Sequence, residues 1–198
     1  MPVDLFLAMT VFAFVMSFTP GPNNIMLTAS GVNFGFTRSV RHMLGVTVGF
    51  VVLLAACAAG LGLVFAAVPM LHVALKIAGS LYLLWLAWKV ANARPVRDDG
   101  DAQARPLTFL QAAAFQWVNP KAVVTSLSAV AIYIRPGQGA IDVPLMLGVF
   151  GLAAILSTSA WTAFGVALRG LLSNPRHARV FNVAMALLLV VSIVPMVI

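Results

Sequence analysis

Long apolar runs separated by short polar segments dominate the chain, and six of these runs could each cross a bilayer as a helix. A spanning helix needs about 20 apolar residues, because each residue advances the helix by about 1.5 Å. The predicted spans are Leu5–Asn33, Val40–Ala67, Val73–Val90, Leu107–Ile134, Val143–Leu168 and Val180–Ile198. The pattern therefore predicts an all-α integral membrane protein with a single transmembrane domain over residues 1–198.

Composition agrees with this class. The chain is 62% hydrophobic and 9% charged, with a mean hydropathy of +1.02, whereas soluble proteins carry roughly 25% charged residues. The net charge of +7 would suggest nucleic acid in a soluble protein, but the basic residues lie in short loops between apolar runs. We therefore expect no nucleic-acid partner. The first residues lack a positive segment, so the first run is expected to be a retained span.

The first span contains a break. Two prolines and a glycine fall within three positions, and proline cannot continue a helix because it lacks the N–H donor and clashes with the preceding turn. Two asparagines follow. Such a break survives in lipid where it is buried in protein or lines a wet cavity. The stretch is Thr19, Pro20, Gly21, Pro22, Asn23 and Asn24.

Basic residues predict the orientation of the spans. Nine of the 12 Lys and Arg residues fall on one side, and the positive-inside rule places that side in the cytoplasm. Both termini are then expected in the periplasm. These nine residues are Arg38, Arg41, Lys89, Arg94, Arg97, Arg105, Arg169, Arg176 and Arg179.

A polar link at about residues 92–106 divides the spans into two sets of three, repeat one at about 1–91 and repeat two at about 107–198. An odd number of spans per half makes the second half enter the membrane inverted, as in inverted-repeat transporters. The fourth span should then be broken like the first, near the midplane. It is interrupted at Gln116, Trp117, Val118, Asn119, Pro120, Lys121 and Ala122, and Pro120 follows Pro22 by 98 residues.

The two breaks together predict a binding site. Each restarts a helix with proline near its first position, so free N–H groups and the positive end of the helix dipole face the break. Two such ends suit a carboxylate, and Asn23, Asn24 and Asn119 offer donors and acceptors for an amine or hydroxyl. Lys121 has three interpretations: a counter-ion to the substrate, a group that changes protonation during transport, or a side chain that snorkels to the cytoplasmic interface or bonds to backbone carbonyls.

Other polar residues have simpler interpretations. His42 stands beside Arg41 at a helix entrance, so we place it at the membrane interface rather than in a proton relay. Ser157, Thr158 and Trp161 either line a cavity or pack between helices. The lone Cys57 excludes an internal disulfide.

Motifs beyond the two breaks carry a family resemblance. They are Gly35-Phe36, Leu44-Gly45 with Gly49-Phe50, Trp85-Leu86-Ala87-Trp88-Lys89, and Phe115 before Gln116. With the breaks, they make the chain similar over essentially its whole length to the LysE/RhtB superfamily of amino-acid exporters. The resemblance implies a six-helix bacterial inner-membrane carrier that expels amino acids or derivatives and is driven by the proton-motive force. The cysteine/O-acetylserine and neutral amino-acid branches look closest. The implied site covers Pro20, Gly21, Pro22, Asn23, Asn119, Pro120 and Lys121.

The leading hypothesis is export of a small neutral amino acid, because no Asp or Glu lies deep in any span to pair with a cationic side chain. A carrier of a basic amino acid, an inorganic ion or a drug is the alternative. An intramembrane enzyme or redox relay is disfavoured, since the spans hold no His, Asp and Glu cluster, and a scaffold would not need paired polar breaks. The expected partners are the amino acid, protons and membrane lipids, with a homodimer left open; no cofactor or metal is expected.

Overall fold

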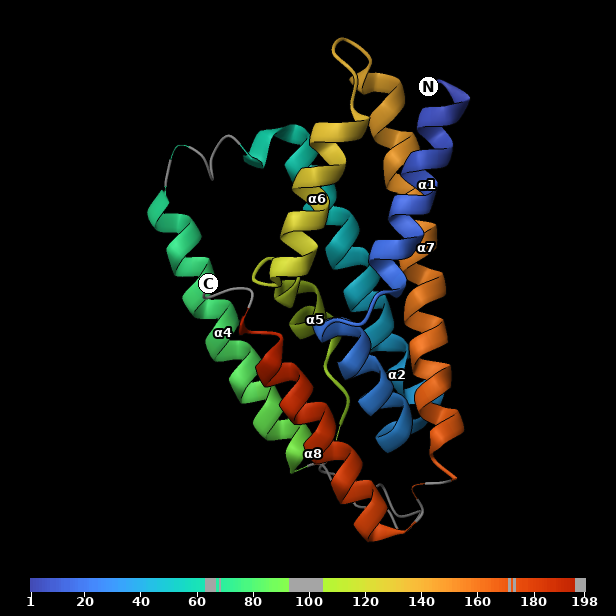
Figure 1. Ribbon diagram of the computed structural model, residues 1–198, viewed down its shortest axis with the longest axis vertical. Coiled ribbons are helices and arrows are strands. Elements are labelled where there is room, and N and C mark those ends of the chain that lie inside the picture. Colours follow the sequence, from blue (N-terminus) through green and yellow to red (C-terminus); the bar gives the residue numbers. More distant parts are fainter. Residues whose placement is uncertain (63–66, 68, 93–104, 171, 173, 195–198) are drawn as a thin grey trace.

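A computed structural model describes residues 1–62, 67, 69–92, 105–170, 172 and 174–194 (Figure 1). These residues form helices and no strand. The helices are α1 (Val3–Phe18), α2 (Pro22–Ala56), the π-helix η1 (Cys57–Leu61), α4 (Pro69–Ala91), α5 (Phe109–Phe115), α6 (Pro120–Tyr133), α7 (Gly139–Leu168) and α8 (Pro175–Val191). Most of the predicted polar link, residues 93–104, and the end of the sixth predicted span, residues 195–198, lie outside the described residues.

The first predicted break is confirmed. Helix α1 ends at Phe18, where the N–H of Thr19 donates to the carbonyl of Val15 at 2.9 Å. The chain then runs extended through Gly21 and restarts as α2 with Pro22 at the first position. Proline tolerates that position because its missing N–H would have no intrahelical acceptor.

Helix α2 reverses direction at Gly35, the one residue inside it with non-helical angles, φ 78° and ψ 174°. Glycine adopts this positive φ without a steric penalty. The side-chain oxygens of Ser30 and Ser39 lie 2.8 Å apart across the reversal, whereas a straight helix would separate two residues nine apart by about 13.5 Å along its axis. The loop expected between the first two spans is therefore a single residue, and α2 has a first arm before Gly35 and a second arm after it.

The second predicted break is also confirmed. Helix α5 is short and starts with a capping box, in which Thr108 accepts from the N–H of Gln111 and Gln111 accepts from the N–H of Thr108. A run of i→i−3 bonds from Gln116 to Asn119 ends it. Helix α6 then begins with Pro120 at its first position and Asn119 as its cap.

Close backbone contacts hold α2 against two other helices. A Cβ on Gly31 would lie 2.2 Å from the carbonyl of Thr162 in α7, and one on Gly165 would lie 2.2 Å from the carbonyl of Thr28. On the second arm, Gly45 and Gly49 leave no room for a side chain beside the backbone of α5. Glycine at these positions lets the helices approach closely.

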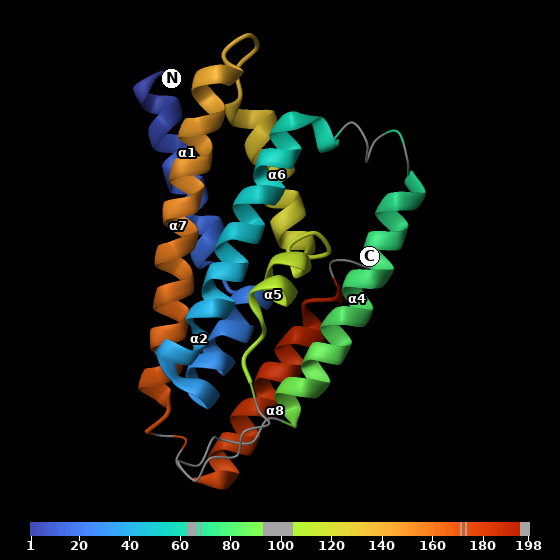
Figure 2. The same ribbon diagram turned by 180° about the vertical axis from the view of Figure 1, so that it is seen from behind.

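The chain crosses the molecule in alternating directions (Figures 1 and 2). In Figure 1 it runs downward through α1 and the first arm of α2, upward through the second arm, and downward through α4. It then runs upward through α5 and α6, downward through α7 and upward through α8. Helices α4 and α8 pack against each other beside the other helices.

Two helical segments, Pro22–Leu61 and Gly139–Leu168, are long and apolar enough to cross a membrane. Shorter apolar helices cover Val3–Phe18, Ile77–Ala91 and Pro120–Tyr133. Large apolar side chains also face outward along several helices, including Leu7, Val11, Leu81, Trp88, Leu152 and Ile155. Such a surface suits contact with lipid better than contact with water, so the all-helical fold is compatible with a membrane protein.

Candidate functional site

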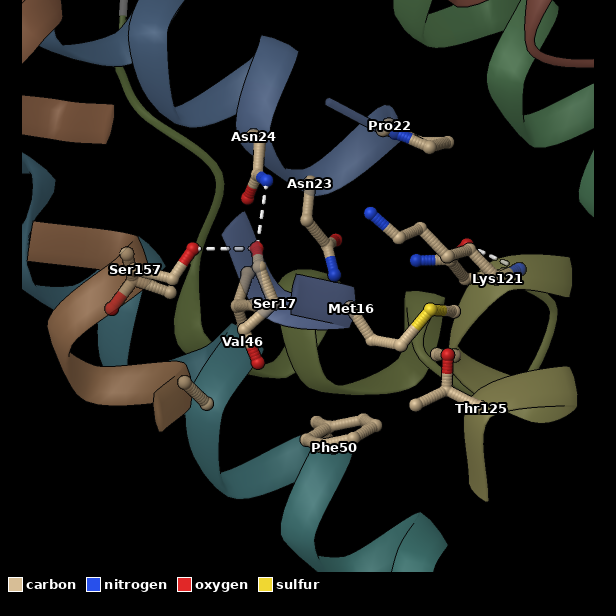
Figure 3. A pocket seen from close by; sticks show the side chains of 15 residues that line it. Met16, Ser17, Pro22, Asn23, Asn24, Val46, Phe50, Lys121, Thr125 and Ser157 are labelled. Carbon is tan, nitrogen blue, oxygen red and sulfur yellow. Dashed lines mark hydrogen bonds between the residues drawn. The ribbon is translucent and has the colours of Figure 1, made fainter. Parts of the chain in front are cut away.

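A cavity of about 70 Å³ lies where the two breaks meet (Figure 3). One water-sized group needs about 10–15 Å³ on the same scale, so the cavity has room for about five or six of them. Its lining residues are Met16, Ser17, Gly21, Pro22, Asn23, Asn24, Val46, Phe50, Asn119, Lys121, Ala122, Thr125, Ala154, Ser157 and Thr158. They come from α1, both arms of α2, α6 and α7, so the site joins both halves of the chain.

A reciprocal pair of amides joins the two breaks. Asn23 Nδ2 donates to Gln116 Oε1 at 2.8 Å, and Gln116 Nε2 donates to Asn23 Oδ1 at 3.1 Å. Gln116 is fully buried, and its Nε2 also donates to the carbonyl of Ala112. A buried amide with its donors and acceptor engaged fixes the position of its partner. The pair therefore sets how the start of α2 stands relative to the end of α5.

Side chains from elsewhere satisfy the carbonyl groups at the end of α1. Asn24 Nδ2 donates to the carbonyls of Ser17 and Thr19 at 2.9 and 3.0 Å. Ser157 on α7 donates a further hydrogen bond to the Ser17 carbonyl at 2.7 Å, as Figure 3 shows. The last carbonyls of a helix have no intrahelical donor. These contacts hold the broken end of α1 in place.

Lys121 reaches from the start of α6 to the first break. Its ammonium donates to the carbonyl of Thr19, where the C-terminal end of α1 presents partial negative charge. The side chain passes over Gly21, where an added Cβ would lie 2.9 Å from Lys121 Cδ. Of the three interpretations of Lys121, bonding to a backbone carbonyl is thus the one realised here, and the half-buried ammonium still lines the cavity.

Both helix starts face the cavity. Pro22 and Asn23 at the start of α2 line it, as do Asn119 and Lys121 at the start of α6. Asn119 Oδ1 caps α6 by accepting from the N–H of Lys121 at 3.2 Å, whereas Gly21 gives α2 no side-chain cap. Within the described residues, no acceptor is found for the N–H groups of Asn23 and Asn24. The cavity therefore meets the positive ends of two helices.

Part of the cavity lining, called here the apolar wall, carries no polar side chain. It is formed by Met16, Val46, Phe50, Ala122 and Ala154. The cavity can thus receive charged and hydrogen-bonding groups together with a small apolar group.

The sequence-predicted residues fall into three groups. Gly21, Pro22, Asn23, Asn24, Asn119 and Lys121 line the cavity. Thr19 and Gln116 do not line it but hydrogen-bond to residues that do. Pro20 and Pro120 are outside the lining and interrupt the helices.

Sequence reasoning missed most of the apolar wall and the polar groups Ser17 and Thr125. Val46 and Phe50 share one helix face at a spacing of four, which is a signal of packing in general and not of a site. Ser157 and Thr158, for which lining and packing were both open, do line the cavity. Trp161 packs against an apolar cluster instead. Among the described residues, no group of three or more His, Cys, Asp and Glu could hold a metal ion.

Comparison with known proteins gives a consistent result. The family model described as LysE type translocator matches residues 14–195. The chain is 32% identical over 194 residues to the cysteine/O-acetylserine efflux protein of Escherichia coli strain K12, covering 96% of each chain. The protein of the same name from Shigella flexneri is 33% identical over 187 residues, covering 92% of each chain. No solved structure matches.

Proposed function

We propose that this chain, which belongs to the LysE type translocator family, exports small neutral amino acids or their derivatives across the bacterial inner membrane. Proteins of this family are transporters and not enzymes, and its exporters reside in the inner membrane. The relatives named for cysteine and O-acetylserine efflux suggest those two compounds as first candidates. The proton-motive force is the proposed energy source.

The meeting of two helix starts at one cavity carries this proposal. The substrate carboxylate would lie on the N-terminal ends of α2 and α6, where free N–H groups and the helix dipoles favour an anion. The Lys121 ammonium, already in the cavity lining, would turn from the Thr19 carbonyl to this carboxylate. The substrate ammonium would then take its place on the carbonyl group of Thr19.

The apolar wall supports a small, uncharged side chain. Met16, Val46 and Phe50 offer no partner to a charge, and burying an unpaired charge is costly. The acidic residue of α7, Asp142, is held by Arg135 through hydrogen bonds of 2.8 and 2.9 Å and does not line the cavity. A basic substrate would therefore lack a counter-ion, and the cavity volume suits a small amino acid.

The directions of the helices support two inverted three-span repeats. The broken pair of α1 and the first arm of α2 runs downward in Figure 1, and the broken pair α5 and α6 runs upward. The turn at Gly35 and the adjoining ends of α4, α7 and α8 lie together at the lower end. These ends carry Arg38, Arg41, Lys89, Arg169, Arg176 and Arg179. We propose that this end faces the cytoplasm and that both termini are periplasmic.

Counterflow in proteoliposomes tests the function. Vesicles loaded with an unlabelled amino acid should take up the same labelled compound through the purified protein without any ion gradient. Cysteine, O-acetylserine, serine and alanine should exchange, whereas lysine and arginine should not. An absence of exchange across the whole neutral panel would refute the proposal, and exchange of lysine would favour the basic-substrate alternative.

A further inference from the structure

A second set of buried polar side chains lies between the cavity and the turn at Gly35. It joins the two arms of α2 through the contact between Ser30 and Ser39, and joins α2 to α8 because Asn33 Nδ2 donates to Asn182 Oδ1 at 3.4 Å. Each of these side chains is at most 4% exposed. We call these four residues and the neighbouring His42 the α2 polar cluster: Ser30, Asn33, Ser39, His42 and Asn182.

His42 stands on the helix face that leads to the cavity. Residues 42, 46 and 50 follow one another at a spacing of four along the second arm of α2, and Val46 and Phe50 line the cavity. His42 is therefore one turn, about 6 Å along the axis, from the cavity wall. It is 1% exposed, so the interfacial position expected from the sequence is wrong.

The imidazole of His42 makes no hydrogen bond to any described residue: both Nδ1 and Nε2 are buried without a partner. The Oδ1 atom of Asn33 is also buried and unpartnered. More than about 90% of buried polar atoms in proteins have a partner, and a histidine ring always carries at least one N–H donor. An ionisable ring left unpaired in a polar cluster has a cost in stability that ordinary packing does not explain.

Basic residues dominate the described elements that pack against α2. Their one acidic residue is Asp142, in the first turn of α7, and it is paired with Arg135 at 2.8 Å. The other ionisable side chains of α2 and of these elements are Arg38, Arg41, Cys57, Tyr82, Lys89, Lys121, Tyr133, Arg169, Arg176, His177 and Arg179. A proton on the buried ring would thus find no unpaired carboxylate on these elements, and it would be stabilised by water. Protonation therefore favours a conformation in which water reaches the cluster.

We propose that His42 is the proton-binding residue that couples export to the proton gradient. In the conformation open to the periplasm, an unprotonated ring nitrogen accepts a proton from water. In the conformation open to the cytoplasm, the same N–H returns its proton to water, while the amino acid crosses in the other direction. The inference rests on the proposed function, and it assigns the proton to a site separate from the substrate cavity.

The test separates exchange from coupling in proteoliposomes that contain the full-length protein. Counterflow of labelled O-acetylserine needs no proton movement. Accumulation of the substrate against its own concentration gradient, driven by a pH difference of one unit, does need it. One proton per substrate allows an accumulation of up to about tenfold per pH unit. The His42→Gln variant should retain counterflow, lose the accumulation and lose substrate-dependent proton flux. His177→Gln, a matched change at an exposed histidine of α8, should behave like the unmodified protein.

The outcomes are distinguishable. If the unmodified protein shows no counterflow, the proposed function fails. If counterflow is present and His42→Gln still accumulates substrate like the unmodified protein, the role of His42 is overturned. Should His42→Gln not assemble, a protein with His72→Gln and His177→Gln keeps His42 as its single histidine. Its ¹⁵N imidazole resonances in liposomes with substrate should then shift as the pH is lowered, and a ring that shows no protonation while the protein still accumulates substrate overturns the inference.

Discussion

The first break, at Thr19–Asn24, and the second, at Gln116–Lys121, both restart a helix with proline, yet different contacts hold them. The second is largely self-contained: hydrogen bonds between residues three apart close the turn from Gln116 to Asn119, and Asn119 caps α6. The first depends on other elements. Besides Asn24 within the break, its carbonyl groups and those at the end of α1 accept from Ser157 on α7 and from Lys121 on α6.

This difference shows which break can respond to a ligand. Local hydrogen bonds between nearby residues persist when helices move, whereas contacts between α1, α6 and α7 change when those helices shift. The carbonyls of the first break are therefore the ones whose donors can be exchanged. In the proposed cycle, the substrate ammonium replaces Lys121 there, which links substrate binding to the relative position of the two halves.

Removing Lys121, the cation that bridges the two breaks, should have the largest effect on transport. Lys121→Ala deletes the donor to the Thr19 carbonyl and the proposed partner of the substrate carboxylate. Loss of one member of a buried charge pair costs about 2–5 kcal/mol, which corresponds to a reduction in counterflow rate of roughly 30-fold to more than 1000-fold. Lys89→Ala removes the same charge beside Trp85 and should leave the rate unchanged. A Lys121→Ala protein that exchanges substrate at the normal rate would remove the bridge from the mechanism.

Replacing Asn24 in the first break or Asn119 in the second by aspartate should change the stability of the protein by different amounts. Asn24 acts as a donor to two carbonyls, and a carboxylate cannot donate. Asn24→Asp should therefore destabilise the protein by about 2–5 kcal/mol. Asn119 acts as an acceptor at a helix start, where aspartate serves about equally well, so Asn119→Asp should change stability by less than about 1 kcal/mol. Thermal unfolding in detergent measures both; equal shifts would contradict the different roles of the two breaks.

How far the sequence predicts these features depends on the range of the interactions. The breaks follow from Pro20, Pro22 and Pro120, because proline acts on its own turn whatever surrounds it. The donor role of Asn24 depends on where the end of α1 lies after folding, and no local pattern encodes it. The sequence predicts a loop between the first two spans, whereas in the structure the chain reverses at the single residue Gly35, which has a positive φ. Burial of His42 likewise depends on the packing of helices distant in sequence.

The smallest expected effect is a difference in stability between variants of two buried serines. Ser157 donates to the Ser17 carbonyl at 2.7 Å, whereas Ser126 is buried with no partner for its hydroxyl among the described residues. Ser157→Ala should lower stability by about 0.5–1.5 kcal/mol, since the carbonyl keeps its bond from Asn24. Ser126→Ala removes a hydroxyl that burial left unpaired, so it should be neutral or slightly stabilising. Unfolding temperatures that fall equally in both variants would show that Ser157 contributes through packing alone, and that the first break needs only Asn24 and Lys121 to stay in place.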